Sequence, residues 1–319
     1  MKLNQVIIGL ILLLTLASCS LETAKTPTHS KLVIASDYLE AKDTLLFLLF
    51  STKNAVHISI ETMSTDSLIE RIRTKQANSA IDLVMLESLY DVTRLDKRGV
   101  FHPIDLVIKT APEAASYSSV KYNYIGFGMD PYIIAYEPIG RHEIKTYNDL
   151  THFNHINTLG RNHSPTFLAP ILKNLSEVKQ RKWVKRYTEH AISKAIPGDS
   201  ILNDSLFKLL PVLTTLSDFE WNKDSILMYK TKALLFPNKQ GKGTYYNLRS
   251  IAVISQASNY TTALDFIHFC TTEKANVKLN EALNTYSIYL NQHDFKQDST
   301  SAEELIPYYS TIDLLNENE

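Results

Sequence analysis

Five acidic residues stand next to apolar segments of this sequence and could line a binding site: Asp37, Glu87, Asp130, Asp218 and Glu220. Burial of a carboxylate is unfavourable unless it meets a cation or hydrogen-bond donors. If several of these acids face one pocket, that pocket favours a cationic ligand, either a metal ion or an organic amine. Taken one at a time, each acid also fits a solvated loop, so the acids alone leave both interpretations open.

Tyrosine is abundant, with 17 residues in the chain, and Tyr245 and Tyr246 form an adjacent pair. In a strand the two rings of such a pair face opposite sides of the sheet, which predicts one buried and one solvated ring. A ring that faced a cleft could instead stack on a ligand or hydrogen-bond to it. Tyr246 is therefore kept among the candidate ligand-binding residues.

Three histidines lie within twelve residues, at positions 152, 155 and 163. His152 and His155 are interpreted as exposed loop residues. His163 differs because Ser164 and Pro165 follow it, and an N-cap residue before a proline favours the start of a helix. His163 is a candidate site residue for that reason.

The sequence carries no motif of the common enzyme classes. It has no G-x-S-x-G, no G-x-G-x-x-G, no Walker A sequence and no H-E-x-x-H. Lys and Arg number 33 against 34 Asp and Glu, a net charge of -1, so the basic excess of a nucleic-acid binder is missing. Two cysteines cannot form a disulfide scaffold. We expect a protein that is not an enzyme and therefore requires no catalytic cofactor. We also expect that it binds no nucleic acid.

The start of the chain predicts export and a lipid anchor. Residues 6–16 form a mainly apolar run, shorter than the ~20 residues that span a membrane but typical of a signal peptide. Leu16-Ala17-Ser18-Cys19 follows and resembles the lipobox of bacterial lipoproteins. The resemblance implies a signal peptide over 1–18, a lipid on Cys19 and a tether over 19–30. An ordinary signal peptide with an incidental cysteine is the alternative.

Strands and helices alternate along the rest of the chain, which predicts an α/β fold with a mostly parallel sheet. Apolar or alternating runs predict strands over 31–35, 57–63, 81–86, 132–136, 156–159, 233–236 and 251–254. Longer periodic segments predict helices over 38–50, 88–98, 165–175, 177–191, 261–270, 273–283 and 302–315. A further helix begins at Leu68, where Ser67 and Glu70 fit a capping box.

Polar residues that follow the predicted strands should share one edge of the sheet. Ligands of open α/β sheets bind beyond the carboxyl ends of the strands, where helix N-termini also offer unpaired N–H groups. This reasoning selects Ser36, Asp37, Tyr38, Ser64, Thr65, Glu87, Ser88, Asn162, His163 and Ser164.

Four segments together resemble the periplasmic solute-binding proteins of ABC transporters, and within them the class II group that includes the ferric-iron-binding proteins. They are the opening strand over 31–38, the strand ending at Glu87 with the helix that ends near Gly99, the segment 130–150, and the segment 236–271. The resemblance implies two α/β lobes, each with a mostly parallel sheet flanked by helices, joined by two hinge strands around a ligand cleft. Lobe 1 would comprise 31–134 and 237–290, and lobe 2 would comprise 135–236 and 291–319.

Some residues match the iron site that the resemblance implies, and others do not. Glu87 stands where the family has a glutamate, and Tyr38 is beside the place of its histidine, so both are candidate metal ligands. The family's tyrosine pair would fall within 215–221, where this chain has no tyrosine, and Asp130 replaces an anion-binding arginine.

The resemblance also implies partners. We expect a monomer, lipid-anchored outside the cytoplasm at a periplasm-facing or cell-surface membrane, which passes its solute to an ABC permease. A sensor lipoprotein that presents a ligand to a receptor, or a lipoprotein hydrolase, stays open as an alternative.

Overall fold

The structure is a computed structural model and describes residues 30–73, 81–110, 112–136, 144–152, 157–158, 211–222, 233–235 and 244–289. Its strands are β1 (Ser30–Ser36), β2 (Val56–Thr62), β3 (Leu83–Leu86), β4 (Phe101–His102), β5 (Ile125–Tyr136), β6 (Asn157–Thr158), β7 (Val212–Thr215), β8 (Ala233–Leu235), β9 (Tyr246–Ile254) and β10 (Tyr286–Ser287). Its helices are η2 (Ala41–Phe47), α2 (Leu48–Asn54), α3 (Thr65–Arg73), α4 (Leu89–Asp96), α5 (Asp105–Thr110), η3 (Pro112–Tyr117), η4 (Tyr147–His152), α9 (Leu216–Asn222), α10 (Tyr260–Thr271) and α11 (Glu273–Ala282). Within these ranges, no helix is both long enough and apolar enough to cross a membrane.

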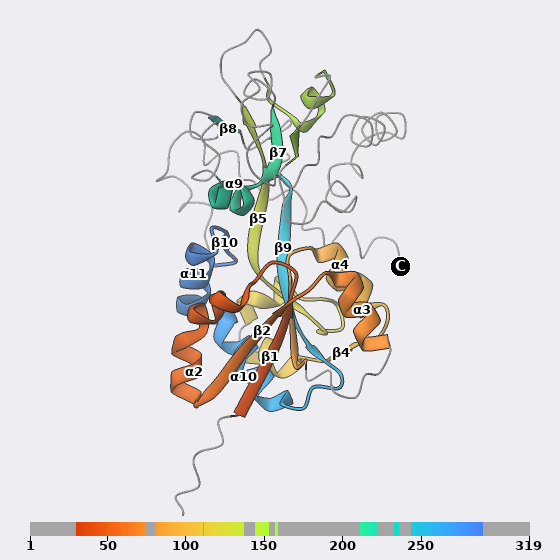
Figure 1. Cartoon of the computed structure of the whole chain (residues 1–319), viewed down its shortest axis with the longest axis vertical. Helices are drawn as coiled ribbons and strands as arrows, with labels where there is room; N and C mark the ends of the chain where they lie inside the picture. Colours follow the sequence, from red (N-terminus) through yellow and green to blue (C-terminus); the bar gives the residue numbers. More distant parts are fainter. Residues whose placement is uncertain are drawn as a thin grey trace, which may run out of the picture.

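Two strands, β5 and β9, run between two lobes, as Figure 1 shows. The sheet order is β2-β1-β3-β9-β5-β7-β6. In lobe 1, β1 pairs in parallel with β2 and β3, and β9 joins β3 and β5 antiparallel. The C-terminal half of β5 then pairs antiparallel with β7 and β8 of lobe 2. The predicted two-lobed α/β fold with two hinge strands is confirmed by these pairings and by the arrangement in Figure 1.

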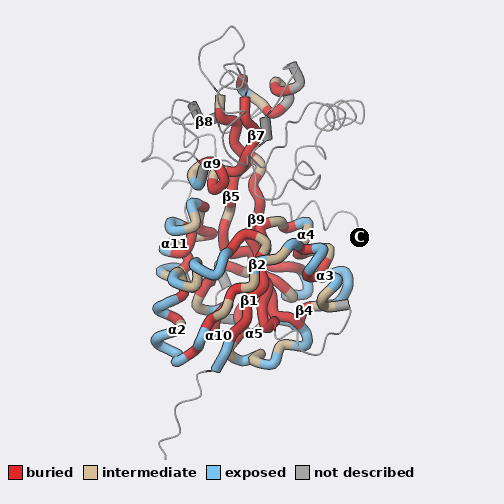
Figure 2. The backbone as a smooth tube through the Cα atoms, viewed as in Figure 1, coloured by how far each residue is buried: buried red, intermediate tan, exposed pale blue. Residues whose placement is uncertain are grey.

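The core of lobe 1 lies on both faces of its sheet. Alternate residues of β1 point to opposite faces, so Leu32 and Ile34 pack on one side and Val33 and Ala35 on the other. The first face is covered by η2, α2, α10 and α11, and the second by α3 and α4. Figure 2 shows the central strands buried and the outer helix surfaces exposed. Cys270 is a fully buried member of the first cluster, as expected for a small core residue.

The hinge strand β5 begins seven residues earlier than the sequence predicts. Gly126, Gly128, Asp130 and Pro131 are residues that strands usually avoid, and the prediction therefore started at Tyr132. The register against β9 shifts between Gly126 and Gly128, which is the signature of a bulge. The pairing with β9 stabilises this stretch although its own propensity is low.

Two helix starts also differ from the sequence prediction. The segment 38–50, predicted as one helix, forms the 3-10 helix η2 followed by α2. The helix α3 begins at Thr65, before the predicted start at Leu68, because the Ser64 hydroxyl accepts a hydrogen bond from the Ser67 N–H at 3.2 Å. Ser64 is thus the N-cap, and the capping box predicted for Ser67 and Glu70 is wrong.

Candidate functional site

A buried arginine, Arg249, stands where the two lobes meet. Its Nη2 lies 2.7 Å from Ser217 Oγ, 3.1 Å from Asp130 Oδ2 and 3.4 Å from Glu87 Oε1. All four residues are at least nine-tenths buried. The carboxylates of Asp130 and Glu87 provide the compensating charge that a buried guanidinium requires.

The sheet register brings these residues together. Arg249 pairs with Gly128 across β9 and β5, and Asp130 lies two residues further along β5 on the same face. Glu87 follows Leu86, the last residue of β3. Leu86 pairs with Ser250 of β9, which is next to Arg249. Ser217 comes from the first turn of α9 in lobe 2. Both hinge strands and one residue from lobe 2 therefore contribute to one cluster.

Further hydrogen bonds hold the cluster in place. The Ser217 N–H donates to Asp130 Oδ1 at 3.0 Å, and the Ser217 hydroxyl donates to Asp130 Oδ2 at 2.5 Å. The ring of Tyr38 stacks against the guanidinium of Arg249 with its centroid 4.5 Å from Cζ, a favourable cation–π geometry. Burial lowers the pKa of Arg249, but Asp130 and Glu87 outweigh this effect and raise it above its ordinary value.

Asp37 adds a second acid beside Glu87. Its Oδ1 accepts a hydrogen bond from the Glu87 N–H at 3.0 Å. Burial, followed by the nearby charge of Glu87, raises the pKa of Asp37 from 3.8 to about 8. Burial likewise raises the pKa of Tyr38 above its ordinary value. At neutral pH the cluster therefore holds a largely protonated Asp37 and a protonated Tyr38 phenol.

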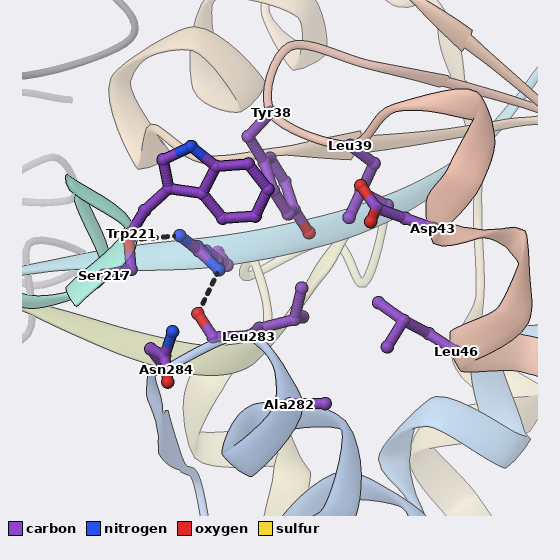
Figure 3. A pocket seen from close by; sticks show the side chains of 10 residues that line it. Tyr38, Leu39, Asp43, Leu46, Ser217, Trp221, Ala282, Leu283 and Asn284 are labelled. Carbon is purple, nitrogen blue, oxygen red and sulfur yellow. Dashed lines mark hydrogen bonds between the residues drawn. The ribbon is translucent and has the colours of Figure 1, made fainter. Parts of the chain in front are cut away.

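A small cavity of about 60 Å³ adjoins Arg249 at the lobe junction. Figure 3 shows Tyr38 and Trp221 on one side of it and Leu283 and Asn284 on the other. Its remaining lining residues are Leu39, Asp43, Leu46, Ser217, Arg249 and Ala282. The residues come from both lobes, so the cavity is part of a cleft between them.

One cation–π contact crosses this cleft. The Lys42 ammonium of η2 in lobe 1 lies 4.5 Å from the ring centroid of Trp221 on α9 in lobe 2. Both side chains are about half exposed, so the contact lies at the rim of the cavity.

The structure brings together only part of the residue set predicted from sequence. Asp37, Tyr38 and Glu87 lie in or beside the Arg249 cluster. Asp218 is buried next to Ser217 and close enough to raise the pKa of Arg249. Asp130, predicted as one of several acids, is fully buried at the centre.

Other predicted residues lie elsewhere. Ser36 is buried, and its hydroxyl accepts hydrogen bonds from the N–H groups of Tyr38 and Leu39. Ser64 is exposed and caps α3, and Thr65 is the first residue of that helix. Tyr246 is buried in the lobe 1 core. None of these side chains lines the described cavity.

Several predictions fall outside the described residues. They are Cys19, Asn162, His163, Ser164, and the helices predicted over 165–175, 177–191 and 302–315.

The tyrosine pair of the ferric-binding group has no counterpart at the expected place. Ser217 and Asp218 stand at the start of α9, within the segment where the resemblance puts that pair. In the part of the chain that the structure describes, no group of three or more His, Cys, Asp and Glu side chains is placed to hold a metal ion. Arg249 lies among the acids instead.

Arg249 and Ser217 are the functional candidates that sequence reasoning missed. Each is a single polar residue at the boundary of an apolar run, and neither belongs to a spacing motif. Only the strand register between β5 and β9 places Arg249 beside Asp130. A signal was nevertheless present, because an acid such as Asp130 within a buried strand needs a cationic partner.

Comparison with known proteins supports the fold assignment. No protein-family model matches the sequence. The chain is 22% identical over 288 residues to the iron uptake protein A1 of Synechocystis sp., which covers 83% of this chain and 80% of that protein. It superposes on iron-bound HitA from Pseudomonas aeruginosa with a TM-score of 0.70 at 16% identity, covering 89% of this chain and 95% of that one. A ferric binding protein from Campylobacter jejuni gives a TM-score of 0.70 at 20% identity, with 90% and 96% covered.

The fold is that of the two-lobed periplasmic binding proteins. The resemblance to the ferric-binding group of ABC solute-binding proteins, indicated by the sequence segments, is confirmed. By name, these relatives are an iron uptake protein and a ferric binding protein, and neither name denotes an enzyme.

Proposed function

We propose that this chain is a lipid-anchored solute-binding protein that captures a small cationic solute between its lobes and delivers it to an ABC permease. The observation that carries the proposal is the charge of the lobe junction. Three buried acids, Glu87, Asp130 and Asp218, lie close to the guanidinium of Arg249. Buried carboxylates gain stability from a cation close to them, so a junction lined by several of them favours a cationic ligand.

Ferric iron is the first cation to test. It is a hard metal ion, and hard ions prefer oxygen ligands. The cluster offers the oxygens of Glu87, Asp130 and Ser217 within one small region. The iron-uptake and ferric-binding relatives favour the same ligand. Because the segment 215–221 contains no tyrosine, we expect the carboxylates to carry most of the binding.

Capture would work by closure of the two lobes about the hinge strands β5 and β9. Ser217 and Trp221 belong to lobe 2, and Tyr38, Glu87 and Arg249 belong to lobe 1. A ligand that contacts both sides stabilises the closed arrangement of the lobes. Closure would bury the ligand and present the permease with a surface made by both lobes.

Export and anchoring complete the proposal. A signal peptide over 1–18, a lipid on Cys19 and a tether over 19–30 would hold the folded lobes outside the cytoplasm, near a permease. The first element that the structure describes is β1, whose first residue is Ser30. A single acyl chain anchors a protein only marginally, so we expect more than one chain on Cys19.

Binding of ferric citrate, followed by calorimetry, tests the function. We expect one saturable site in the wild type and an affinity at least about tenfold lower in Glu87→Gln, equal to about 1.4 kcal/mol. The variant Glu273→Gln, which changes an exposed acid on α11, is the matched control and should bind as the wild type does. Equal affinities in all three proteins would remove Glu87 from the site, and no binding of any metal ion or amine would contradict cation capture.

A further inference from the structure

Three oxygens converge on one nitrogen of Arg249. Glu87 Oε1, Asp130 Oδ2 and Ser217 Oγ all lie between 2.7 and 3.4 Å from Nη2. They come from the end of β3, from β5 and from α9, so three elements aim oxygen atoms at one point. Nη2 thus lies at the centre of a buried group of three oxygen atoms, and the guanidinium of Arg249 is the cation that these oxygens bind.

We propose that Arg249 is an internal competitor for the cationic ligand and sets the affinity of the cleft for cations. This inference rests on the proposed function. Oxygen ligands of a hard ion such as Ca²⁺ lie about 2.3–2.6 Å from the metal, so a metal ion at the position of Nη2 needs only a modest contraction of the three oxygens. A guanidinium stays charged at any relevant pH, and it cannot share that position with a metal ion. Binding must therefore displace the side chain of Arg249.

Apart from the stacked ring of Tyr38, the guanidinium is held mainly through that one nitrogen. Nη1 has a single long contact, 3.5 Å to the carbonyl oxygen of Leu283. Nε is buried and has no hydrogen-bond partner. A well-fixed buried guanidinium normally uses several of its five donors. The neighbouring cavity of about 60 Å³ is lined by Arg249 itself, so the side chain has adjacent space into which it can move.

Competition of this kind determines which cations the cleft accepts. A ligand gains the attraction of Glu87 and Asp130 but must replace the attraction that Arg249 already has for them. Attraction to the carboxylates grows with the charge of the ligand. We therefore expect a polyvalent ion to compete with Arg249 for these carboxylates better than a monovalent ion does.

Terbium(III) is a suitable probe because it is a hard trivalent ion whose luminescence is sensitised by nearby aromatic rings. Tyr38 and Trp221 line the adjoining cavity. The purified full-length protein in mild detergent is titrated with terbium as wild type and as Arg249→Gln. We expect the variant to bind terbium at least about tenfold more tightly. Adding Glu87→Gln to this variant should remove most of the gain.

Arg94→Gln is the matched control, because Arg94 also pairs with two acids, Asp66 and Asp91, but on the surface of lobe 1. It should leave terbium affinity unchanged. If folded Arg249→Gln binds terbium no more tightly than the wild type does, the competition is refuted while the proposed function stands. If neither protein binds terbium or ferric iron, the proposed function fails as well.

A measurement on the wild type covers the case in which Arg249→Gln does not fold. Removal of one partner from a buried ion pair is strongly destabilising. Titration with diamagnetic lanthanum(III), followed by the arginine side-chain NMR signals, should shift the Arg249 Nε–H signal at saturation. An Arg249 signal that stays in place while lanthanum binds would overturn the inference.

Discussion

At the residue scale, Asp37 and Glu87 set the charge of the lobe junction. Asp37 is half-buried and has the charges of Glu87 and Asp91 near it, and its pKa of about 8 keeps it largely protonated at pH 7. An acid whose folded-state pKa is raised stabilises the fold below its ordinary pKa of 3.8, and that stability is lost as pH rises toward the folded value. A bound cation would instead favour the ionised acid, so ligand binding and loss of this proton should be coupled.

Asp37→Asn should remove this pH dependence. The amide oxygen can still accept the hydrogen bond from the Glu87 N–H, and it carries no charge at any pH. We expect the free energy of unfolding to fall between pH 5 and 8 by about 1 kcal/mol or more in the wild type and by less in the variant. Urea titrations at several pH values measure it. Parallel pH profiles for the two proteins would show that Asp37 ionises normally in the fold.

The sequence identified most acids of the site but not the cation among them. Asp37 and Glu87 follow strands, and the position of a residue after a strand can be read from the apolar pattern alone. Arg249 lies inside a strand, in a stretch where the pattern predicted a strand only from residue 251. Its role depends on which strands are neighbours, and long-range register is not encoded in local spacing.

At the element scale, the close approach of α11 to β5 fixes the hinge strand. A Cβ atom on Gly128 would overlap Oδ1 of Asn280. Asn280 cannot move easily, because its amide donates to the Phe127 carbonyl at 2.8 Å and its Oδ1 accepts from the Thr285 hydroxyl at 2.7 Å. Gly128 pairs with Arg249, so this packing also positions the arginine.

Gly128→Ala should therefore destabilise the protein by about 2 kcal/mol or more, as overpacked cores do. Gly99→Ala is the comparison variant. Gly99 has a φ of +67° and open space around its Cα, so alanine there is expected to cost only about 1 kcal/mol. Denaturant unfolding of both variants gives the difference. A Gly128→Ala protein as stable as Gly99→Ala would mean that Asn280 relaxes without loss.

The elements themselves were largely predictable where their local pattern was strong. β1, β2, β3, α10 and α11 lie within one or two residues of their predicted bounds. β7 and α9 were missed, because Val212–Thr215 is a short apolar run that could belong to either element type. These missed elements belong to lobe 2 and include Ser217.

At the scale of the whole molecule, the proposed anchor and the cleft would together hold a captured solute close to a membrane. The two-lobed fold follows from the alternation of strands and helices and from the four family segments. The identity of the ligand does not follow from these patterns, because it depends on which few side chains the fold brings together at the lobe junction.

Cys19→Ser tests the anchor. Without the thiol no lipid can be attached, so we expect the variant to lose labelling by palmitate and to leave the membrane fraction. Cys270→Ser, which changes a buried core residue, controls for loss of a cysteine and should be labelled as the wild type is. Labelled Cys19→Ser protein would contradict the lipobox interpretation.

The most direct measurement of the central claim is anomalous X-ray diffraction from crystals of the protein grown with ferric citrate. We predict one iron peak at the lobe junction, in contact with carboxylate oxygens of Glu87 and Asp130, with the side chain of Arg249 moved away from these oxygens. Saturated crystals with no iron peak at these residues, or with iron bound elsewhere and Arg249 still paired to both acids, would contradict it.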